Sequence, residues 1–292
     1  MTIAVYARNT RENFPHYLEQ LIALSNIEQF NIIVFKPYLD FLMAEHEAHF
    51  NLSTYCNFEE LVAKADYVIS LGGDGTLLET LEFVRKSGVP VLGVNTGRLG
   101  FLATVYKEDF SKAIQLLINE KYTLDKRELI VLENRANDFN NLNYALNEFT
   151  IHKKESGAMI HIDTYVDGVF LNSYFADGLI VSTPTGSTAY SLSCGGPIML
   201  PDSDNFIITP IAPHNLNVRP IVISNNKILS FKVSGRSDSF NVSLDSRSQT
   251  ITQQAELIIR KADFRFNLIN LDGQHFFETL RNKLLWGLDK RQ

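Results

Sequence analysis

The residues best suited to chemistry form the stretch Gly72-Gly73-Asp74-Gly75-Thr76. It lies between the apolar run 67–71 and the amphipathic segment 77–87, so the hydrophobic period predicts a strand, a glycine-rich turn and a helix. The glycines leave backbone N–H groups open to a phosphate. A carboxylate would repel that phosphate, so Asp74 suggests proton abstraction or metal binding beside it. The alternative is an ordinary strand-to-helix turn with an Asp cap.

Two better-known glycine motifs do not fit this stretch. A P-loop needs Lys-Ser or Lys-Thr after its last glycine, whereas Thr76 is followed by Leu77. The dinucleotide fingerprint needs a third glycine or alanine where Leu78 stands. The sequence therefore indicates a third way of handling phosphate.

A second polar stretch runs from Ala176 to Tyr190. It ends a predicted strand, turns at Pro184 and Gly186, and carries five hydroxyl side chains between positions 182 and 188. That is more than one helix cap requires. Hydroxyls and small residues at a helix start suit a ribose, a phosphate or a base edge, and Tyr190 offers a ring and a hydroxyl. The alternative is a tight loop that its own side chains stabilise.

Other polar residues give weaker signals. The pair Asn147-Glu148 interrupts an apolar run and could bind a ribose diol or an adenine edge, or mark an exposed strand face. Arg98, in a glycine loop, could bind a phosphate or form a surface salt bridge. His214 has no partner at metal-ligand spacing, so we expect a structural role and no protein-built metal site.

Composition excludes several classes of protein. The 292 residues carry a formal net charge of −6, which disfavours a nucleic-acid binder. No apolar run approaches the roughly 20 residues of a membrane span, so we expect no membrane partner. The N-terminus enters a strand without a basic region, and Cys56 and Cys194 are the two cysteines. We therefore expect no signal peptide and a cytoplasmic location.

Strand and helix patterns alternate in the first third of the chain. This predicts an α/β domain with a doubly wound, mostly parallel sheet over residues 1–122, which carries the glycine loop at a strand's carboxyl end. Short alternating strands follow, with a hairpin turn at Asp167-Gly168, and predict a β-rich, sandwich-like domain over 123–275. A C-terminal helix, within 276–292 and with Gly287 as its C-cap, is expected to pack back on the first domain.

Together these motifs resemble the NAD kinase family. The resemblance runs from about residue 65 to the C-terminus, with the motifs in the family's order. It rests on 72–78, 95–101, 147–148, 177–193, 195–197 and 212–214. It implies a two-domain architecture like that of NAD kinases and diacylglycerol kinases, with an NAD-binding second domain. It further implies ATP-dependent phosphorylation of the adenosine-ribose 2′-hydroxyl of NAD to give NADP.

The resemblance also assigns roles to residues. Asp74 would be the general base, and Asp74 with Gly75 would contact the substrate. The remaining cofactor-binding positions that it implies are Asn147, Glu148, Asp177, Thr188, Ala189, Tyr190, Ser191, Leu192, Ser193, Ala212 and Arg247. Family members often carry a basic residue near position 79 and near position 175, where this chain has Glu79 and Phe175; Ala158 is a third variable position.

Charge neutralisation by Mg²⁺ or a similar cation is expected, because phosphoryl transfer depends on positioning and neutralisation. We also expect a homo-oligomer, a dimer or tetramer. Two alternatives stay open: a lipid kinase of the same superfamily, and a non-catalytic dinucleotide sensor. A lipid kinase would need a membrane-facing surface, for which the sequence holds no amphipathic basic helix. A sensor would gain nothing from Asp74 beside a phosphate.

Overall fold

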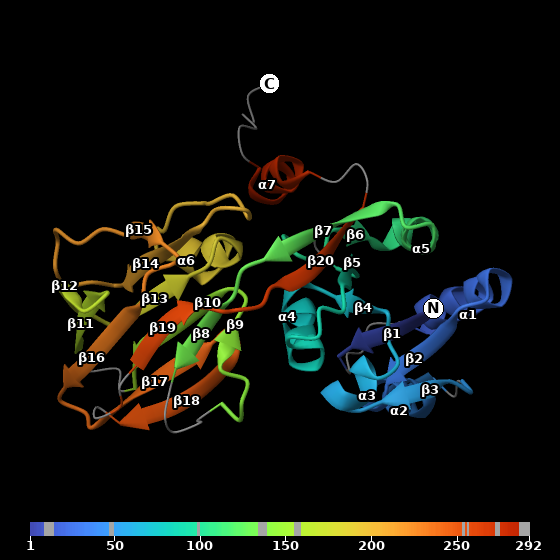
Figure 1. The fold of residues 1–292 in the computed structure, drawn as a ribbon, viewed down its shortest axis with the longest axis horizontal. Helices are drawn as coiled ribbons and strands as arrows, with labels where there is room; N and C mark the ends of the chain where they lie inside the picture. Colours follow the sequence, from blue (N-terminus) through green and yellow to red (C-terminus); the bar gives the residue numbers. More distant parts are fainter. Residues whose placement is uncertain are drawn as a thin grey trace. The chain divides into compact units, whose positions relative to one another are not determined.

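The structure, a computed structural model, describes residues 1–8, 15–46, 50–97, 100–133, 139–154, 159–252, 255, 257–271 and 275–285. The chain divides into two compact units (Figure 1). The first contains Met1–Lys126 and Phe266–Gln292, and the second contains Arg127–Arg265.

An eight-stranded sheet organises the first unit, in the order β3-β2-β1-β4-β5-β20-β7, with β6 paired to β5. The strands are β1 (Thr2–Ala7), β2 (Asn31–Phe35), β3 (Ser53–Tyr55), β4 (Tyr67–Gly72), β5 (Val91–Asn95), β6 (Val105–Tyr106), β7 (Tyr122–Arg127) and β20 (Phe266–Leu271). The helices are α1 (Pro15–Glu28), α2 (Lys36–His46), α3 (Phe58–Val62), α4 (Asp74–Val84), α5 (Phe110–Ile118) and α7 (Phe276–Leu284), with the 3₁₀ turn η1 (Lys107–Asp109).

The central strands β1, β2, β4 and β5 pair in parallel and are buried on both faces. One face packs on α1, α2 and α5 in a continuous core. On α5 the buried residues Phe110, Ala113, Ile114 and Leu117 recur with helical spacing, which is why this segment forms a helix. The opposite face includes Tyr6 of β1, whose ring packs against Phe83 of α4. The expected doubly wound α/β domain is confirmed.

The second unit is an antiparallel sandwich, as expected. One six-stranded sheet has the order β15-β14-β13-β10-β17-β18 and the other β12-β11-β16-β19-β8-β9. Inward side chains of both sheets form one core, in which Phe149 packs near Phe231. The strands are β8 (Ile130–Glu133), β9 (Tyr144–Ala145), β10 (Glu148–Lys153), β11 (Ile160–Val166), β12 (Val169–Ala176), β13 (Gly178–Ser182), β14 (Asn205–Ile211), β15 (Ile221–Ser224), β16 (Leu229–Gly235), β17 (Ser239–Leu244), β18 (Arg247–Thr252) and β19 (Leu257–Lys261). Two short helical segments follow β13: η2 (Thr185–Thr188) and α6 (Tyr190–Ser193).

The compact units differ from the sequence-based ranges in two strands: β7 pairs with β20 in the sheet of the first unit, although most of it lies beyond the predicted boundary at residue 122. The ranges put residues 264–271 in the β-rich domain, whereas β20 lies in the sheet of the first unit, where Leu268 pairs with Val91. A lone apolar run does not indicate which of two sheets it joins. The helix α7 also belongs to the first unit, and its Phe276 ring lies near the ring of Phe101. The expected C-cap Gly287 lies outside the described residues.

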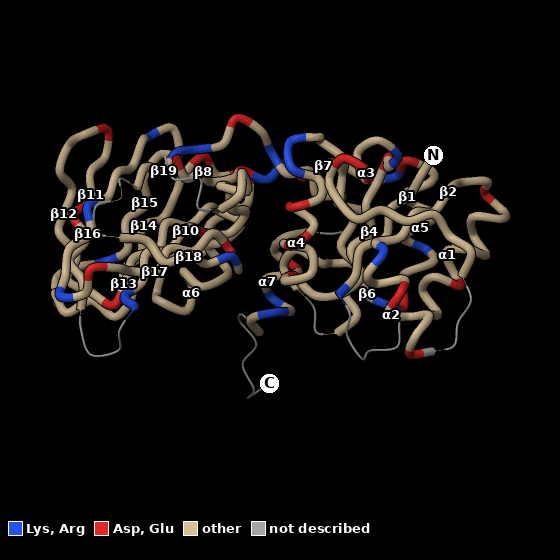
Figure 2. Tube along the Cα trace, turned by 90° about the horizontal axis from the view of Figure 1, so that it is seen from below, with Lys and Arg blue, Asp and Glu red and all other residues tan. Residues whose placement is uncertain are grey.

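Charge is mixed along both units. In Figure 2 basic and acidic positions are interspersed among the described residues of each unit. No helix in the described part of the chain is long and apolar enough to cross a membrane.

Candidate active site

The order in which the chain adds strands to the sheet reverses between the parallel strands β1 and β4. From β1 the chain builds outward through β2 to β3, whereas β4 and β5 extend to the other side. Ligands of such sheets bind beyond the carboxyl ends of the strands at this switch point. Arg8 follows β1, the glycine loop follows β4, and Thr96 follows β5. Because these strands are parallel, the three segments lie at one edge of the sheet.

The Asp74 side chain is fixed by backbone donors of another loop. Its Oδ1 accepts N–H groups from Leu102 at 3.0 Å and from Ala103 at 2.9 Å. Its Oδ2 accepts the N–H of Phe101 at 2.7 Å. A carboxylate offers about four lone-pair sites. With three of them occupied, Oδ2 keeps one for a further donor, such as a substrate hydroxyl.

Gly100 makes this arrangement possible. A Cβ built on Gly100 would lie 1.9 Å from Asp74 Oδ1, so any side chain there would displace the carboxylate. Gly72 has a similar role inside the glycine loop. Its φ is +151°, and a Cβ there would lie 2.4 Å from Oγ1 of Thr76. These glycines therefore set the close approach of the two loops, in addition to exposing N–H groups.

In the second unit, the amides of Leu146, Asn147 and Glu148 all donate to the Asp245 carboxylate, at 2.9, 2.8 and 3.2 Å respectively. Asp245 sits in the turn between β17 and β18 with a φ of +53°, a conformation that Asp tolerates better than most residues. Asp245 thus fixes the backbone at the Asn147-Glu148 pair. Sequence reasoning gave Asp245 no role, because its three donors lie about a hundred positions away in the chain.

Glu148 has an unusual environment. Burial and the charge of Asp245 raise its pKa to about 8, against the effect of a hydrogen bond from the Tyr190 backbone. Burial also raises the pKa of Asp245. The Oε2 atom of Glu148 is buried without a hydrogen-bond partner. A buried carboxyl oxygen without a partner is costly in a folded protein, and such groups cluster at functional sites.

Hydroxyls in and just after the second stretch form hydrogen bonds within the protein, and several of these bonds join the loop to other segments. The Thr183 hydroxyl donates to the Leu146 carbonyl at 2.6 Å, and the Ser187 hydroxyl accepts the Met199 N–H at 3.0 Å. Thr188 donates to the Thr185 carbonyl at 3.3 Å, and Ser191 shares a hydrogen bond with Thr209 at 2.9 Å. The side chains therefore hold the loop in place both internally and against neighbouring segments, which agrees with the alternative of a loop that its own side chains stabilise.

Several residues at the start of α6 remain accessible in the described structure. Tyr190 is 40% exposed. Ser193 is exposed, and Ala189 and Leu192 are half-buried. Gly186 allows the loop to cross the Asn147 backbone, because a Cβ there would lie 2.1 Å from the Asn147 carbonyl oxygen. The loop therefore packs directly against the Asn147-Glu148 pair.

Three further predicted positions have different surroundings. Asp177 forms an ion pair with Lys153 at 2.6 Å and stays about one third exposed. Ala212 has a φ of +43°, a strained conformation for an alanine and one that is often found at binding sites. Arg247 donates to the carbonyls of Leu142 and Tyr144. Its guanidinium thus supports the loop that leads to β10.

The weaker sequence signals concern His214, Arg98 and Ala158. His214 lies edge-on to the Phe175 ring, which stacks on His161. Arg98 and Ala158 lie outside the described residues. Within the described part of the chain, no group of three or more His, Cys, Asp or Glu is placed to hold a metal ion. Sequence reasoning missed Arg8 and Lys153, since single basic residues next to strands carry no distinctive spacing.

Similar solved structures define the class of protein first. The yeast NADH kinase complexed with NADH matches with a TM-score of 0.86 at 21% identity, over 99% of this chain and 88% of that chain. An NAD kinase from Archaeoglobus fulgidus in complex with ATP matches with a TM-score of 0.73 at 25% identity, over 97% and 99%. The two-domain fold of this chain is therefore the one found in these two solved kinases.

Sequence comparisons then identify the family. Residues 30–122 match the model of the ATP-NAD kinase N-terminal domain, and residues 146–271 match that of the C-terminal domain. The NAD kinase of Flavobacterium psychrophilum is 43% identical over the full length of both chains. That of Bacteroides fragilis is 47% identical over 80% of this chain and 81% of its own. The chain belongs to the NAD kinase family and is an enzyme, which confirms the resemblance seen in its motifs.

Proposed function

We propose that this chain transfers the γ-phosphoryl group of ATP to the 2′-hydroxyl of the adenosine ribose of NAD, giving NADP, with Asp74 as the general base. The observation that carries the assignment of the base is the geometry of its carboxylate. Three backbone N–H groups fix its orientation, and Oδ2 keeps one lone pair for the substrate hydroxyl. Asp74 also begins α4 at the switch point of the sheet.

A secondary hydroxyl is a poor nucleophile until a base takes its proton as it attacks. Oδ2 of Asp74 would receive that proton while the oxygen attacks the γ-phosphorus and ADP leaves. The first turn of α4 contributes a positive dipole end and unsatisfied N–H groups, including that of Gly75, to the phosphates. Most of the rate then depends on holding the hydroxyl and the phosphorus in line.

On the NAD side we propose contacts from Asn147, Glu148, Asp177 and Ala212, together with the segment Thr188, Ala189, Tyr190, Ser191, Leu192 and Ser193. The unpartnered Oε2 of Glu148 supports this role, since a ribose hydroxyl would satisfy it. The exposed Tyr190 ring is suited to stacking on a base. Ser191 and Arg247 would act indirectly, because both already bind other parts of the unit.

Mg²⁺ would neutralise charge on the triphosphate. This ion usually keeps several waters and binds through substrate phosphates and one or two carboxylates. The described residues offer no larger ligand set, which fits a cation that arrives with ATP. We further propose a division of labour between a phosphate-handling α/β part and an NAD-binding sandwich part. A cytoplasmic location and a homo-oligomeric state complete the proposal.

The test is to incubate the purified protein with NAD, ATP and Mg²⁺ and to measure NADP by chromatography. Stoichiometric formation of NADP and ADP is the expected result. NAD binding by titration without any turnover would instead identify a dinucleotide sensor. Phosphorylation of diacylglycerol in vesicles, with NAD left unchanged, would identify a lipid kinase. Either result would overturn the proposed function.

A further inference from the structure

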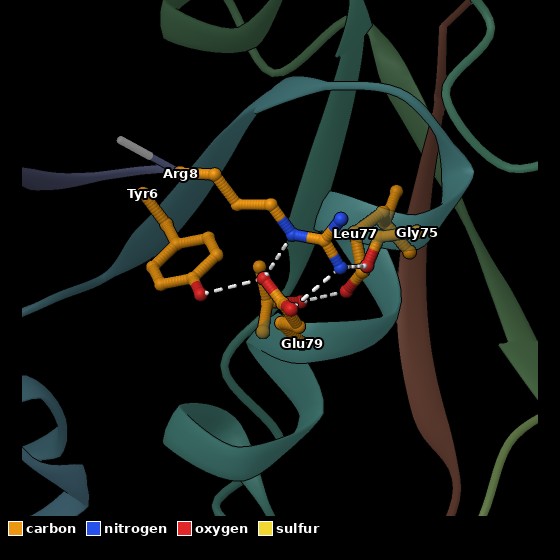
Figure 3. Close-up of polar contacts among 6 residues, drawn as sticks. Tyr6, Arg8, Gly75, Leu77 and Glu79 are labelled. Carbon is orange, nitrogen blue, oxygen red and sulfur yellow. Dashed lines mark hydrogen bonds and ion pairs between the residues drawn. The ribbon is translucent and has the colours of Figure 1, made fainter. Parts of the chain in front are cut away.

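Arg8 is the first residue after β1, directly across the switch point from the glycine loop that follows β4. Its guanidinium is fixed at several points (Figure 3). Nε donates to Glu79 Oε2 at 2.7 Å, and Nη2 donates to Glu79 Oε1 at 2.5 Å. Nη2 also donates to the Gly75 carbonyl at 3.2 Å. The Tyr6 hydroxyl donates to Glu79 Oε2 at 2.9 Å and so holds the acceptor in place.

This arrangement leaves one edge of the guanidinium available. An arginine side chain has five N–H donors. Two of them belong to Nη1, which has no hydrogen-bond partner among the described residues. A Cβ built on Gly75 would lie 3.6 Å from Nη2 and 3.7 Å from Nη1, so the guanidinium lies over the exposed Gly75 of the loop. A fixed cation with free donors over a glycine loop is suited to a phosphate oxygen.

The acidic Glu79 now has an explanation. Position 79 carries an acidic residue, and Glu79 forms an ion pair with Arg8, the residue that follows β1. The side chains of Arg8 and Glu79 are 44% and 32% exposed. An ion pair with this exposure adds little to stability, so fold stability alone does not explain four interactions converging here.

We propose that Arg8 binds a phosphate oxygen of the bound nucleoside triphosphate through Nη1, and that Glu79 is the positioning residue that holds it over the glycine loop. The role rests on the proposed function, since it concerns the phosphoryl donor of that reaction. The alternative is a purely structural link between the end of β1 and α4. The two differ in whether loss of Arg8 changes triphosphate binding or only stability.

The experiment compares Arg8→Met, Arg8→Lys and Glu79→Gln with the wild type. The matched control is Lys36→Met, which removes a similarly exposed cation, paired with Asp40, from the same unit. Binding of Mg-ATP is titrated directly, and the KM values for ATP and NAD are measured separately. Arg8→Met should weaken ATP binding and raise KM for ATP about tenfold or more, the effect of one lost charge-assisted hydrogen bond. KM for NAD should stay within about twofold.

The other variants separate charge from position. Arg8→Lys should recover part of the ATP affinity, because it keeps the charge but loses the fork geometry. Glu79→Gln should raise KM for ATP by less than Arg8→Met, and Lys36→Met should leave both KM values unchanged. ATP binding by Arg8→Met within about twofold of wild type would overturn the role of Arg8. A wild type that binds ATP yet forms no NADP would overturn the proposed function and leave the role of Arg8 intact.

Discussion

Replacing Asp74 with Asn tests the base, and the structure specifies what the change does. The Asn side chain has one acceptor oxygen, whereas the carboxylate accepts from Phe101, Leu102 and Ala103. The orientation that keeps two bonds places the oxygen at Oδ1 and the NH₂ group at Oδ2. The amide would then face the Phe101 N–H, donor against donor. It would also put a donor at the position from which the base must accept the proton.

Two magnitudes follow from this geometry. Loss of the base should lower kcat by roughly 10²–10⁴, which corresponds to about 3–5 kcal/mol in the barrier. Loss of one hydrogen bond to a charged acceptor should cost about 1.5–3 kcal/mol of folding stability. That cost should lower Tm by about 3–12 °C for a unit of this size. The KM values for NAD and ATP should change much less than kcat, because the other proposed contacts of both substrates remain.

The assay is steady-state formation of NADP at saturating NAD and ATP, with Tm measured on the same preparations. Asp66→Asn is the matched control, since Asp66 accepts one backbone N–H, from Thr2 at 2.7 Å, and an amide oxygen can keep that bond. Its kcat should stay within about twofold of wild type. A kcat for Asp74→Asn within tenfold of wild type would refute the assignment of Asp74 as the base.

Three further predictions follow from the site. Gly100→Ala should lower both kcat and Tm, because its Cβ would lie 1.9 Å from Asp74 Oδ1. The control Gly97→Ala should leave Tm unchanged, because nothing lies within 4 Å of a Cβ at that position. Equal Tm values for the two variants would contradict the close approach of Gly100 to Asp74. Alanine at Asn147, Glu148 or Asp177 should raise KM for NAD about tenfold, and by more than KM for ATP. The control is Asp167→Ala, which breaks the exposed ion pair with Lys227. Equal changes in both KM values would count against these NAD contacts. Glu148 keeps its proton in the folded state up to about pH 8 but loses it near 4.5 when unfolded, so folding stability should fall as pH rises across this window. The free energy of unfolding, measured in urea at pH 5.5 and 8.0, should fall less steeply in Glu148→Gln, by up to about 1.4 kcal/mol per pH unit. The same dependence of this free energy on pH in both proteins would exclude the raised pKa of Glu148.

Much of the fold was predictable because its signals are local. Residues 110–118 have the apolar spacing of a helix, and they form α5. Asp167 and Gly168 both adopt positive φ, as a tight hairpin turn requires. The segments that sequence reasoning left unassigned include α2 and β15. β15 has only 4 residues, too few to show a period, and α2 mixes charged residues with its apolar ones, so neither periodicity stands out.

In the candidate site, the sequence points to the carboxylates Asp74 and Glu148 but not to the partners that hold them. Asp74 and Glu148 are recognisable in the sequence because a carboxylate is unexpected in a phosphate-type glycine loop or in an apolar strand. Their partners do not stand out, since Phe101 to Ala103 act through backbone amides, which every residue type except proline carries.

Asp245 and Asp74 are both held in place by backbone amides. Each accepts three consecutive backbone N–H groups, 146–148 for Asp245 and 101–103 for Asp74. Backbone amides stabilise an anion but cannot give up a proton to it. A lysine or arginine would instead compete with the phosphates for that anion and would bind them itself. In the proposed mechanism, amide donors would therefore hold the carboxylate of Asp74 in place to accept a proton and would leave a cation such as Arg8 for the nucleotide. This separation explains how an acidic chain could bind a polyanionic substrate beside an aspartate.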